Sequence, residues 1–119
     1  MEKYFVTYNQ ALALKELGFD EPCLAYYEGT DLTHGMLNDI GKRRYLIAPL
    51  KSQVFEWFRE KHSIHNIVSY YGKGQWNIEI LDYKGNELIQ IEDNTFWSYE
   101  EAESACIDNL IEIVKSKKQ

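Results

Sequence analysis

The sequence predicts an α+β fold, with antiparallel sheet (a hairpin plus a three-stranded meander) packed with about three helices in the order α-β-β-α-β-β-β-α. Apolar residues recur at helical spacing over 50–61 and 98–114, and they alternate with polar residues over 67–92. Breaks at Gly72-Lys73-Gly74 and Lys84-Gly85-Asn86 divide the alternating stretch into short runs, which is typical of antiparallel strands joined by tight turns.

Length, charge and hydropathy limit the classes of protein to consider. The chain has 119 residues, of which 45% are hydrophobic, so we expect residues 1–119 to form a single domain with a moderate core. We find neither an apolar run of membrane-spanning length nor a secretory signal, and we expect a cytoplasmic protein without a membrane partner. The acidic net charge of −6 disfavours generic binding to nucleic acid, because that binding depends on clustered Lys and Arg.

The first predicted element is a helix over residues 8–17. Alanine and leucine dominate this segment, and either Thr7 or Asn9 can serve as its N-cap. Gly18 can adopt the left-handed conformation that ends a helix, which lets Phe19 pack back onto the last turn in a Schellman motif.

Two strands and a long loop follow this helix. Cys23–Tyr27 is predicted to be a strand and Arg44–Ala48 its antiparallel partner. The intervening Glu28–Arg43 is a loop that can hold a short helical turn at Thr33–Asp39. Loops of this length are usually functional, so it is a candidate to close a binding site.

The second half is predicted to begin with an amphipathic helix after Pro49, ending near Ser63. Period-two patterns then indicate three consecutive antiparallel strands at Ile67–Tyr71, Gln75–Tyr83 and Glu87–Glu92.

The last predicted element is a helix that begins after Ser98. Ser98 and Glu101 form a capping-box pattern, and Trp97 is placed to pack on Ala102 as a hydrophobic staple. The expected apolar stripe is Ala102, Cys106, Leu110, Ile113 and Val114.

The histidine and cysteine residues do not form a recognised catalytic or metal-binding pattern. His62 and His65 are three residues apart, but the predicted helix end between them separates the rings, and no CxxC or HExxH motif accompanies them. Cys106 lies on the predicted core stripe, where a thiol is unreactive. We therefore expect no catalytic residue, metal or cofactor.

Aromatic residues and one basic run define a candidate interaction surface. Adjacent aromatic residues in strands point to opposite faces of the sheet, so some rings should be exposed unless a helix covers them. Exposed Tyr and Trp are enriched at binding hot spots, whereas the basic run could equally be a solvated end of a loop. The candidate surface residues are Tyr26, Tyr70, Tyr71, Trp76, Tyr83, Lys42, Arg43 and Arg44.

Three segments, at residues 14–23, 55–61 and 99–106, carry a resemblance to a known family. The segments read LKELGFDEPC, FEWFREK and YEEAESAC. They resemble a family of small uncharacterised proteins found in phages, prophages and mobile regions of Bacteroides-type bacteria. The resemblance implies a phage or prophage context, and it implies no activity, cofactor or site residue.

Three functions follow from these patterns. We expect first a non-enzymatic phage or prophage accessory protein that binds a host or phage protein, or a second copy of itself. The alternative is a small-ligand binder or enzyme whose site is closed by the loop at residues 28–43. The third is nucleic-acid binding, because the helix, meander and helix of the second half follow the order of a double-stranded RNA-binding domain. Glu100, Glu101 and Glu103 argue against it, because they occupy the start of the final helix, where such domains present basic residues.

Overall fold

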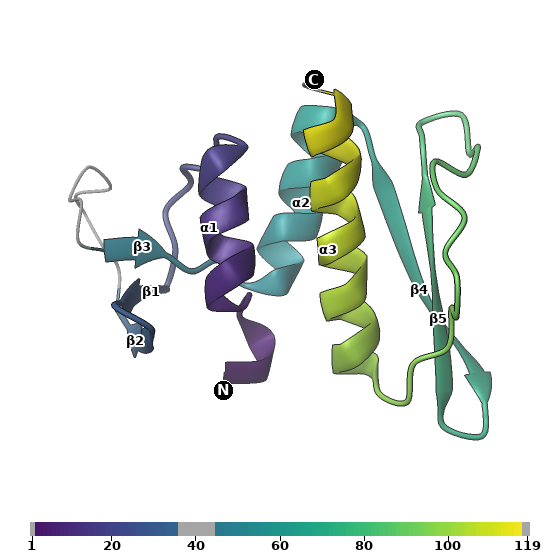
Figure 1. Cartoon of the computed structure of the whole chain (residues 1–119), viewed down its shortest axis with the longest axis horizontal. Coiled ribbons are helices and arrows are strands. Elements are labelled where there is room, and N and C mark those ends of the chain that lie inside the picture. Colours follow the sequence, from purple (N-terminus) through teal and green to yellow (C-terminus); the bar gives the residue numbers. More distant parts are fainter. Residues whose placement is uncertain (1, 36–44, 118–119) are drawn as a thin grey trace. The chain divides into compact units, whose positions relative to one another are not determined.

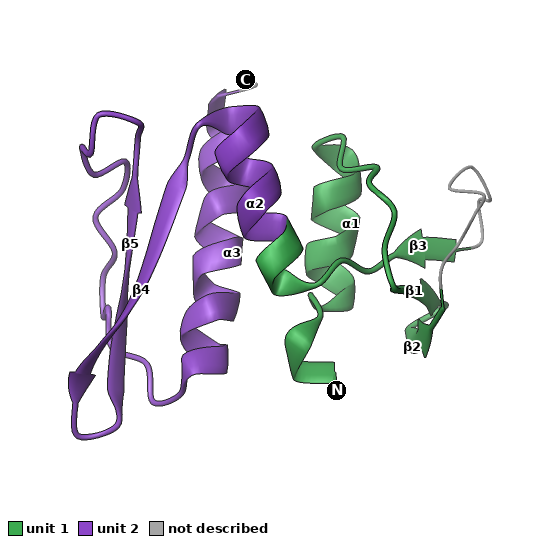
Figure 2. Ribbon diagram, turned by 180° about the vertical axis from the view of Figure 1, so that it is seen from behind, with its two compact units in different colours: residues 1–53 green, residues 54–119 purple. Residues whose placement is uncertain are grey.

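A computed structural model of the chain describes residues 2–35 and 45–117 and shows the predicted α+β class (Figure 1). Groups of helix and strand alternate in the predicted order, and all strand pairs are antiparallel. The chain divides into two compact units, residues 1–53 and 54–119, with the boundary inside one helix (Figure 2). This division does not test the prediction of a single domain, which stays a prediction.

Unit 1 begins with the short 3₁₀ helix η1 (Glu2–Tyr4), followed by helix α1 (Tyr8–Glu16). Thr7 is the N-cap of α1 and forms a complete capping box with Gln10, as one of the two predicted caps. Gly18, at φ 98°, lets the N–H of Phe19 donate to the carbonyl of Leu14 over 3.0 Å. This bond and the one from Gly18 to Lys15 complete the predicted Schellman motif.

The sheet of unit 1 contains β1 (Ala25–Glu28), β2 (Asp31–His34) and β3 (Tyr45–Ile47), in the spatial order β2-β1-β3. The predicted pairing of the first strand with the strand before Pro49 is confirmed by the antiparallel register of β1 with β3. The predicted helical turn at residues 33–39 is wrong at its start, because Thr33 and His34 belong to β2. The rest of that turn, residues 36–39, lies outside the described residues.

A two-residue turn creates the strand β2 that the sequence did not predict. Glu28 pairs with Asp31, which leaves Gly29 and Thr30 as the turn, and Gly29 has φ 63°. A type II′ hairpin turn requires glycine at this first position, so the start of the predicted loop is a tight hairpin.

The core of unit 1 lies between α1 and the sheet, and α1 packs against β3. Residues from before α1 and after β3 also join it, since Val6 donates its N–H to the carbonyl of Pro49 over 3.1 Å. The buried apolar residues of this unit include Phe5, Val6, Ala11, Leu14, Leu17, Phe19, Cys23, Ala25, Tyr27, Leu46, Ile47 and Ala48.

Unit 2 contains most of helix α2 (Lys51–His62), the hairpin of β4 (His65–Gly72) and β5 (Gln75–Leu81), and helix α3 (Tyr99–Lys117). Helix α3 lies along the hairpin and packs against both of its strands (Figure 1). The buried apolar residues of this unit include Val54, Phe55, Trp57, Phe58, Ile64, Ile78, Ile80, Ala102, Cys106, Ile107, Leu110, Ile111 and Val114.

The predicted third strand, Glu87–Glu92, is not a strand in the structure. Glu87 bridges Leu81, and a regular antiparallel ladder from that bridge would place Glu92 opposite Trp76. Trp76 instead bridges Phe96, four residues later, so the extra residues leave the ladder. The segment after β5 therefore follows the edge of the hairpin without forming continuous pairing.

Helix α3 begins at the predicted cap. The Ser98 Oγ atom accepts from the N–H of Glu101 at 3.1 Å, and Glu101 accepts from the N–H of Trp97 at 3.3 Å. The predicted staple of Trp97 on Ala102 leaves most of the indole in solvent, because Trp97 is 65% exposed. Within the predicted stripe only Ile113 is half-buried rather than buried.

Candidate functional site

The turn that joins β4 and β5 sits at one end of unit 2, and aromatic residues gather beside it. Tyr70 lies directly opposite Trp76 in the hairpin register. Trp76 exchanges two backbone hydrogen bonds with Phe96, each 2.8 Å long. Three aromatic residues from separate segments therefore stand side by side across this end of the hairpin.

A continuous row of rings crosses from the hairpin to α3. The ring centroid of Trp76 is 4.9 Å from that of Tyr70 and 5.1 Å from that of Tyr99. We call Tyr70, Trp76 and Tyr99 the aromatic row. Tyr70 is 56% exposed and Tyr99 43% exposed, while Trp76 between them is half-buried.

The two hairpin residues of the aromatic row, Tyr70 and Trp76, lie at the turn end of the hairpin face that packs in the core. Side chains alternate along a strand, so Trp76 shares a face with Ile78 and Ile80, which are buried. Towards the turn the same face becomes exposed at Tyr70. Packing therefore fixes Trp76 in the middle of the row and leaves the terminal residues Tyr70 and Tyr99 accessible.

Two further exposed aromatic residues are close to the row in sequence. Tyr71 is 51% exposed and its hydroxyl lies 3.1 Å from Thr95 Oγ1, at hydrogen-bonding distance. Trp97 precedes the cap of α3 and is the more exposed of the two. An indole exposed to this degree is unusual in a folded chain and is typical of interaction surfaces.

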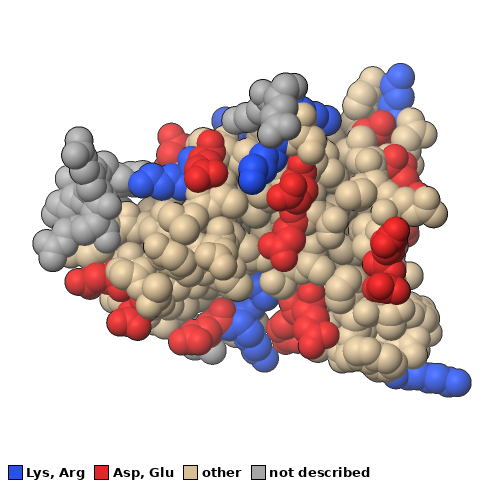
Figure 3. All heavy atoms as spheres, in the orientation of Figure 1, with Lys and Arg blue, Asp and Glu red and all other residues tan. Residues whose placement is uncertain are grey.

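Carboxylates border the row at the start of α3. Burial, with the nearby carboxylates of Glu103 and Glu100, raises the pKa of the Tyr99 hydroxyl. Glu101 caps the same helix end. In Figure 3 the lower right, where Figure 1 places the hairpin turn, carries mainly uncharged atoms, with acidic groups along its border and a basic side chain at its outer tip.

The structure gathers only part of the predicted surface. Tyr70, Tyr71 and Trp76 lie at the turn end of the hairpin, whereas Tyr83 follows the other end of β5. Tyr26 belongs to unit 1, where its ring packs 5.1 Å from that of Tyr45. The basic residues Lys42, Arg43 and Arg44 lie outside the described residues.

Sequence reasoning missed Trp97 and Tyr99 as surface residues. The sequence predicts Trp97 as a staple and Tyr99 in the first turn of a helix, so neither is among the predicted surface residues. The available signal was an aromatic residue on each side of the cap Ser98, followed by three glutamates. A helix start of this composition is rarely buried.

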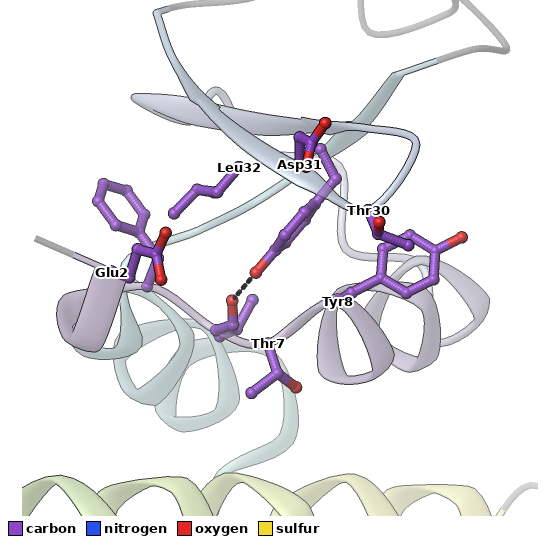
Figure 4. Close-up of a pocket in the computed structure, with 9 residues that line it drawn as sticks. Glu2, Thr7, Tyr8, Thr30, Asp31 and Leu32 are labelled. Carbon is purple, nitrogen blue, oxygen red and sulfur yellow. Dashed lines mark hydrogen bonds between the residues drawn. The ribbon is translucent and has the colours of Figure 1, made fainter.

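Unit 1 contains a separate pocket of about 340 Å³ (Figure 4). It lies between the entry to α1 and the β1–β2 turn, so it borders the loop that was predicted to close a site. Its lining residues are Glu2, Phe5, Val6, Thr7, Tyr8, Tyr27, Thr30, Asp31 and Leu32.

The chemistry of this pocket is aromatic and acidic. The rings of Tyr8 and Tyr27 meet edge to face, 5.5 Å apart, and the Tyr27 hydroxyl donates to the carbonyl of Val6 over 2.8 Å. Burial and the carboxylate of Glu2 raise the pKa of Tyr27. Both charged side chains in the lining, Glu2 and Asp31, are carboxylates.

The remaining candidates for chemistry serve the core or lie at the surface. Burial raises the pKa of Cys23 and of Cys106 to about 12, and both thiols are free. The ring of His62 packs 5.0 Å from that of Trp57, whereas His65 is exposed on β4. Within residues 2–35 and 45–117, no three His, Cys, Asp or Glu side chains are grouped to hold a metal ion.

Comparison of the chain with protein-family models, curated proteins and solved structures finds no match. In the part of the chain that the structure describes, no helix has both the length and the apolar character needed to cross a bilayer.

Proposed function

We propose that this protein is a non-enzymatic interaction protein that binds its partner through the aromatic row of unit 2. The observation that carries the proposal is the continuity of the exposed rings, with Trp76 in contact with both Tyr70 and Tyr99. Large aromatic side chains bury much area for little loss of conformational entropy, which is why they dominate binding hot spots.

The position of the row favours binding over a purely structural role. Trp76 is fixed by its backbone pairing with Phe96 and by contacts with two rings, so the surface is pre-organised before a partner arrives. A pre-organised surface loses less conformational entropy on binding. Tyr70 and Tyr99 contribute exposed area that packing inside unit 2 leaves uncovered.

The proposed biological setting is a phage or prophage, and the proposed partner is a host or phage protein. This setting rests on the resemblance of residues 14–23, 55–61 and 99–106 to the phage-associated family. Two of these segments, 55–61 and 99–106, belong to unit 2, and the third begins in α1.

A quantitative capture experiment tests the proposal. The purified chain is immobilised, exposed to lysate of its native host with and without phage infection, and compared with the double variant Tyr70→Ser, Tyr99→Ser. We expect a partner that the unchanged chain retains and the double variant loses. The matched control is Tyr83→Ser, because Tyr83 is 73% exposed in the same unit but follows the opposite end of β5.

Solution mass measured on the same preparations covers the possibility of self-association. A second copy as partner predicts a dimer that the double variant converts to a monomer. If the chain stays monomeric and retains no protein, or if Tyr83→Ser loses the partner as completely as the double variant, the proposal is wrong.

A second candidate function, small-ligand binding in unit 1, is favoured by the pocket beside the β1–β2 turn. Its aromatic walls and two carboxylates suit a small organic cation, since an ammonium group is attracted both by ring faces and by negative charge. Nuclear magnetic resonance titration with small amines would shift the Tyr8 and Tyr27 ring signals. The variant Asp31→Asn should weaken the shifts and Glu16→Gln should not; equal shifts with small carboxylates would exclude the candidate.

A further inference from the structure

We infer that the aromatic row recognises an arginine side chain, carried on an exposed segment of the partner protein. This inference rests on the proposed interaction function and names the chemistry of the group that the surface binds. It combines three features of unit 2: the stacked rings, the carboxylates at the start of α3, and the accessibility of the rings at both ends of the row.

The charges around the row select a cation. Glu103 is four residues after Tyr99 on α3, so the two side chains lie on the same face of the helix, and Glu100 is the next residue after Tyr99. The raised pKa of the Tyr99 hydroxyl is consistent with both carboxylates lying near this end of the row. Glu101 adds a third carboxylate in the same turn of helix. Lys73 in the hairpin turn, three residues after Tyr70, is an opposing positive charge. The positive pole at the start of α3 offsets part of this negative charge, but three carboxylates exceed it, so the balance attracts a basic group and repels a phosphate.

The rings select a flat cation over a compact one. A guanidinium group stacks on the face of Trp or Tyr and at the same time directs its N–H groups in its own plane to carboxylates. A lysine ammonium can use the carboxylates but cannot stack, and it is more strongly hydrated. Tyr70 packs on Trp76 at an interplanar angle of 53°, and the two terminal residues Tyr70 and Tyr99 are 56% and 43% exposed.

The arrangement of the row places stacking and charge at the same end. Tyr99 is the first residue of α3, and its ring contacts Trp76 on one side while Glu103 and Glu100 act on its hydroxyl. An arginine that stacks on Tyr99 therefore has carboxylates within the reach of its N–H groups. Tyr70, at the other end of the row, offers a second stacking position further from the glutamates.

Short Gly-Ser peptides that carry arginine, lysine or citrulline are the probe for this inference. Citrulline keeps the planar shape of arginine and removes its charge, so the three peptides separate stacking from charge. Binding is followed by tryptophan fluorescence, in which Trp76 and the exposed Trp97 respond while Trp57 is buried. We expect the arginine peptide to bind at least about fivefold more tightly than either of the others.

Protein variants locate the binding. Tyr99→Ser should weaken binding of the arginine peptide by a factor of about five or more. The double variant Glu100→Gln, Glu103→Gln should also weaken this binding and should remove most of its dependence on salt concentration. Glu112→Gln is the control, because Glu112 is exposed on the same helix, roughly 18 Å beyond the first turn at the α-helical rise. Far-ultraviolet circular dichroism of each variant establishes that the fold is kept.

The outcomes separate this inference from the proposed function. Equal binding of arginine and citrulline peptides, loss of binding only with Glu112→Gln, or tighter binding of single-stranded RNA than of the arginine peptide would overturn the inference. If the arginine peptide does not bind but Tyr70→Ser, Tyr99→Ser still loses the captured partner, the inference fails and the interaction function stands. If neither the peptide nor a partner is bound, both fail.

Discussion

Asn94 takes the place of a strand residue beside Ile78. Its Oδ1 atom accepts from the N–H of Ile78 and its Nδ2 atom donates to the carbonyl of Ile78, each over 2.8 Å. An amide side chain has the same donor and acceptor as a peptide group, so Asn94 satisfies the outer edge of β5 where the irregular segment has left the ladder. The same contact holds the segment that carries Phe96 beside Trp76.

Replacing Asn94 with Ala should lower the free energy of unfolding by about 2 kcal/mol, because both backbone groups of Ile78 lose a partly buried partner. Chemical denaturation followed by circular dichroism measures this change. Asn94→Asp keeps the acceptor but places a carboxylate oxygen against the carbonyl of Ile78, so its cost should be at least as large as that of Asn94→Ala. A cost below about 0.5 kcal/mol for Asn94→Ala would show that water replaces the side chain.

Replacing Tyr27 with Phe should cost about 1 kcal/mol of stability. The buried hydroxyl donates to the carbonyl of Val6, and the substitution removes this bond while keeping the ring. Tyr4→Phe is the control, because Tyr4 is exposed and its hydroxyl adds little to stability. Equal effects of the two substitutions in thermal unfolding would contradict the role assigned to the Tyr27 hydroxyl.

Cys23 and Cys106 should be almost unreactive in the folded protein. Burial raises each pKa from 9.0 to about 12, which lowers the thiolate fraction at pH 8 roughly a thousandfold. A thiol reagent at pH 8 should therefore label both cysteines only after unfolding. Rapid labelling of either thiol in the folded chain would contradict its burial.

The same pKa shifts predict that stability falls in alkaline solution. Unfolded thiols ionise near pH 9.0 while the folded thiols stay protonated up to about pH 12, so the unfolded state is favoured as the pH rises between these values. Denaturation midpoints measured on either side of pH 9 test this. In the double variant Cys23→Ala, Cys106→Ala, the free energy of unfolding should fall less steeply as the pH rises above 9.

Replacing Trp97 with Ser should change the free energy of unfolding by no more than about 0.5 kcal/mol, because most of the indole is in solvent. The backbone N–H that donates to Glu101 is kept in this variant. Trp57→Ser is the contrast, since Trp57 is buried and its loss should cost about 3 kcal/mol or more. A large loss of stability with Trp97→Ser would assign Trp97 to the core and remove it from the surface.

The caps and core faces were predictable because they depend on neighbours in sequence. Thr7 with Gln10, Gly18 with Phe19, and Ser98 each act within a few residues, so their patterns are readable in one dimension. The hairpin of β4 and β5 was predictable for the same reason, since its glycine turn fixes which residues pair.

The departures from prediction depend on contacts that no local pattern encodes. The sequence does not predict β2, because Gly29 on its own marks equally well the start of a long loop and a two-residue hairpin turn. Glu87–Glu92 was predicted as a strand from its alternation alone, but Asn94 supplies the edge contacts through its side chain and removes the need for continuous pairing. A side chain that replaces backbone pairing leaves no periodic signal.

The candidate site was predictable in part. Tyr70 and Trp76 are predicted to be outward, and they meet at the turn end of the hairpin, but Trp76 is half-buried on the face that it shares with Ile78. Tyr99 could not be assigned to the same surface, because its contact with Trp76 joins a helix to a strand across a loop. Tyr83 resembled these residues in sequence but follows the other end of β5.

Hydroxyl-radical footprinting of the chain, free and bound to its captured partner, tests the aromatic row most directly. Mass spectrometry reads the oxidation of each exposed aromatic residue, and Tyr83 serves as the internal reference in the same unit. We predict that Tyr70 and Tyr99 are protected in the complex while Tyr83 is oxidised as before. Unchanged oxidation of Tyr70 and Tyr99 in a complex that protects Tyr83 or Tyr4 would contradict the assignment of the binding surface.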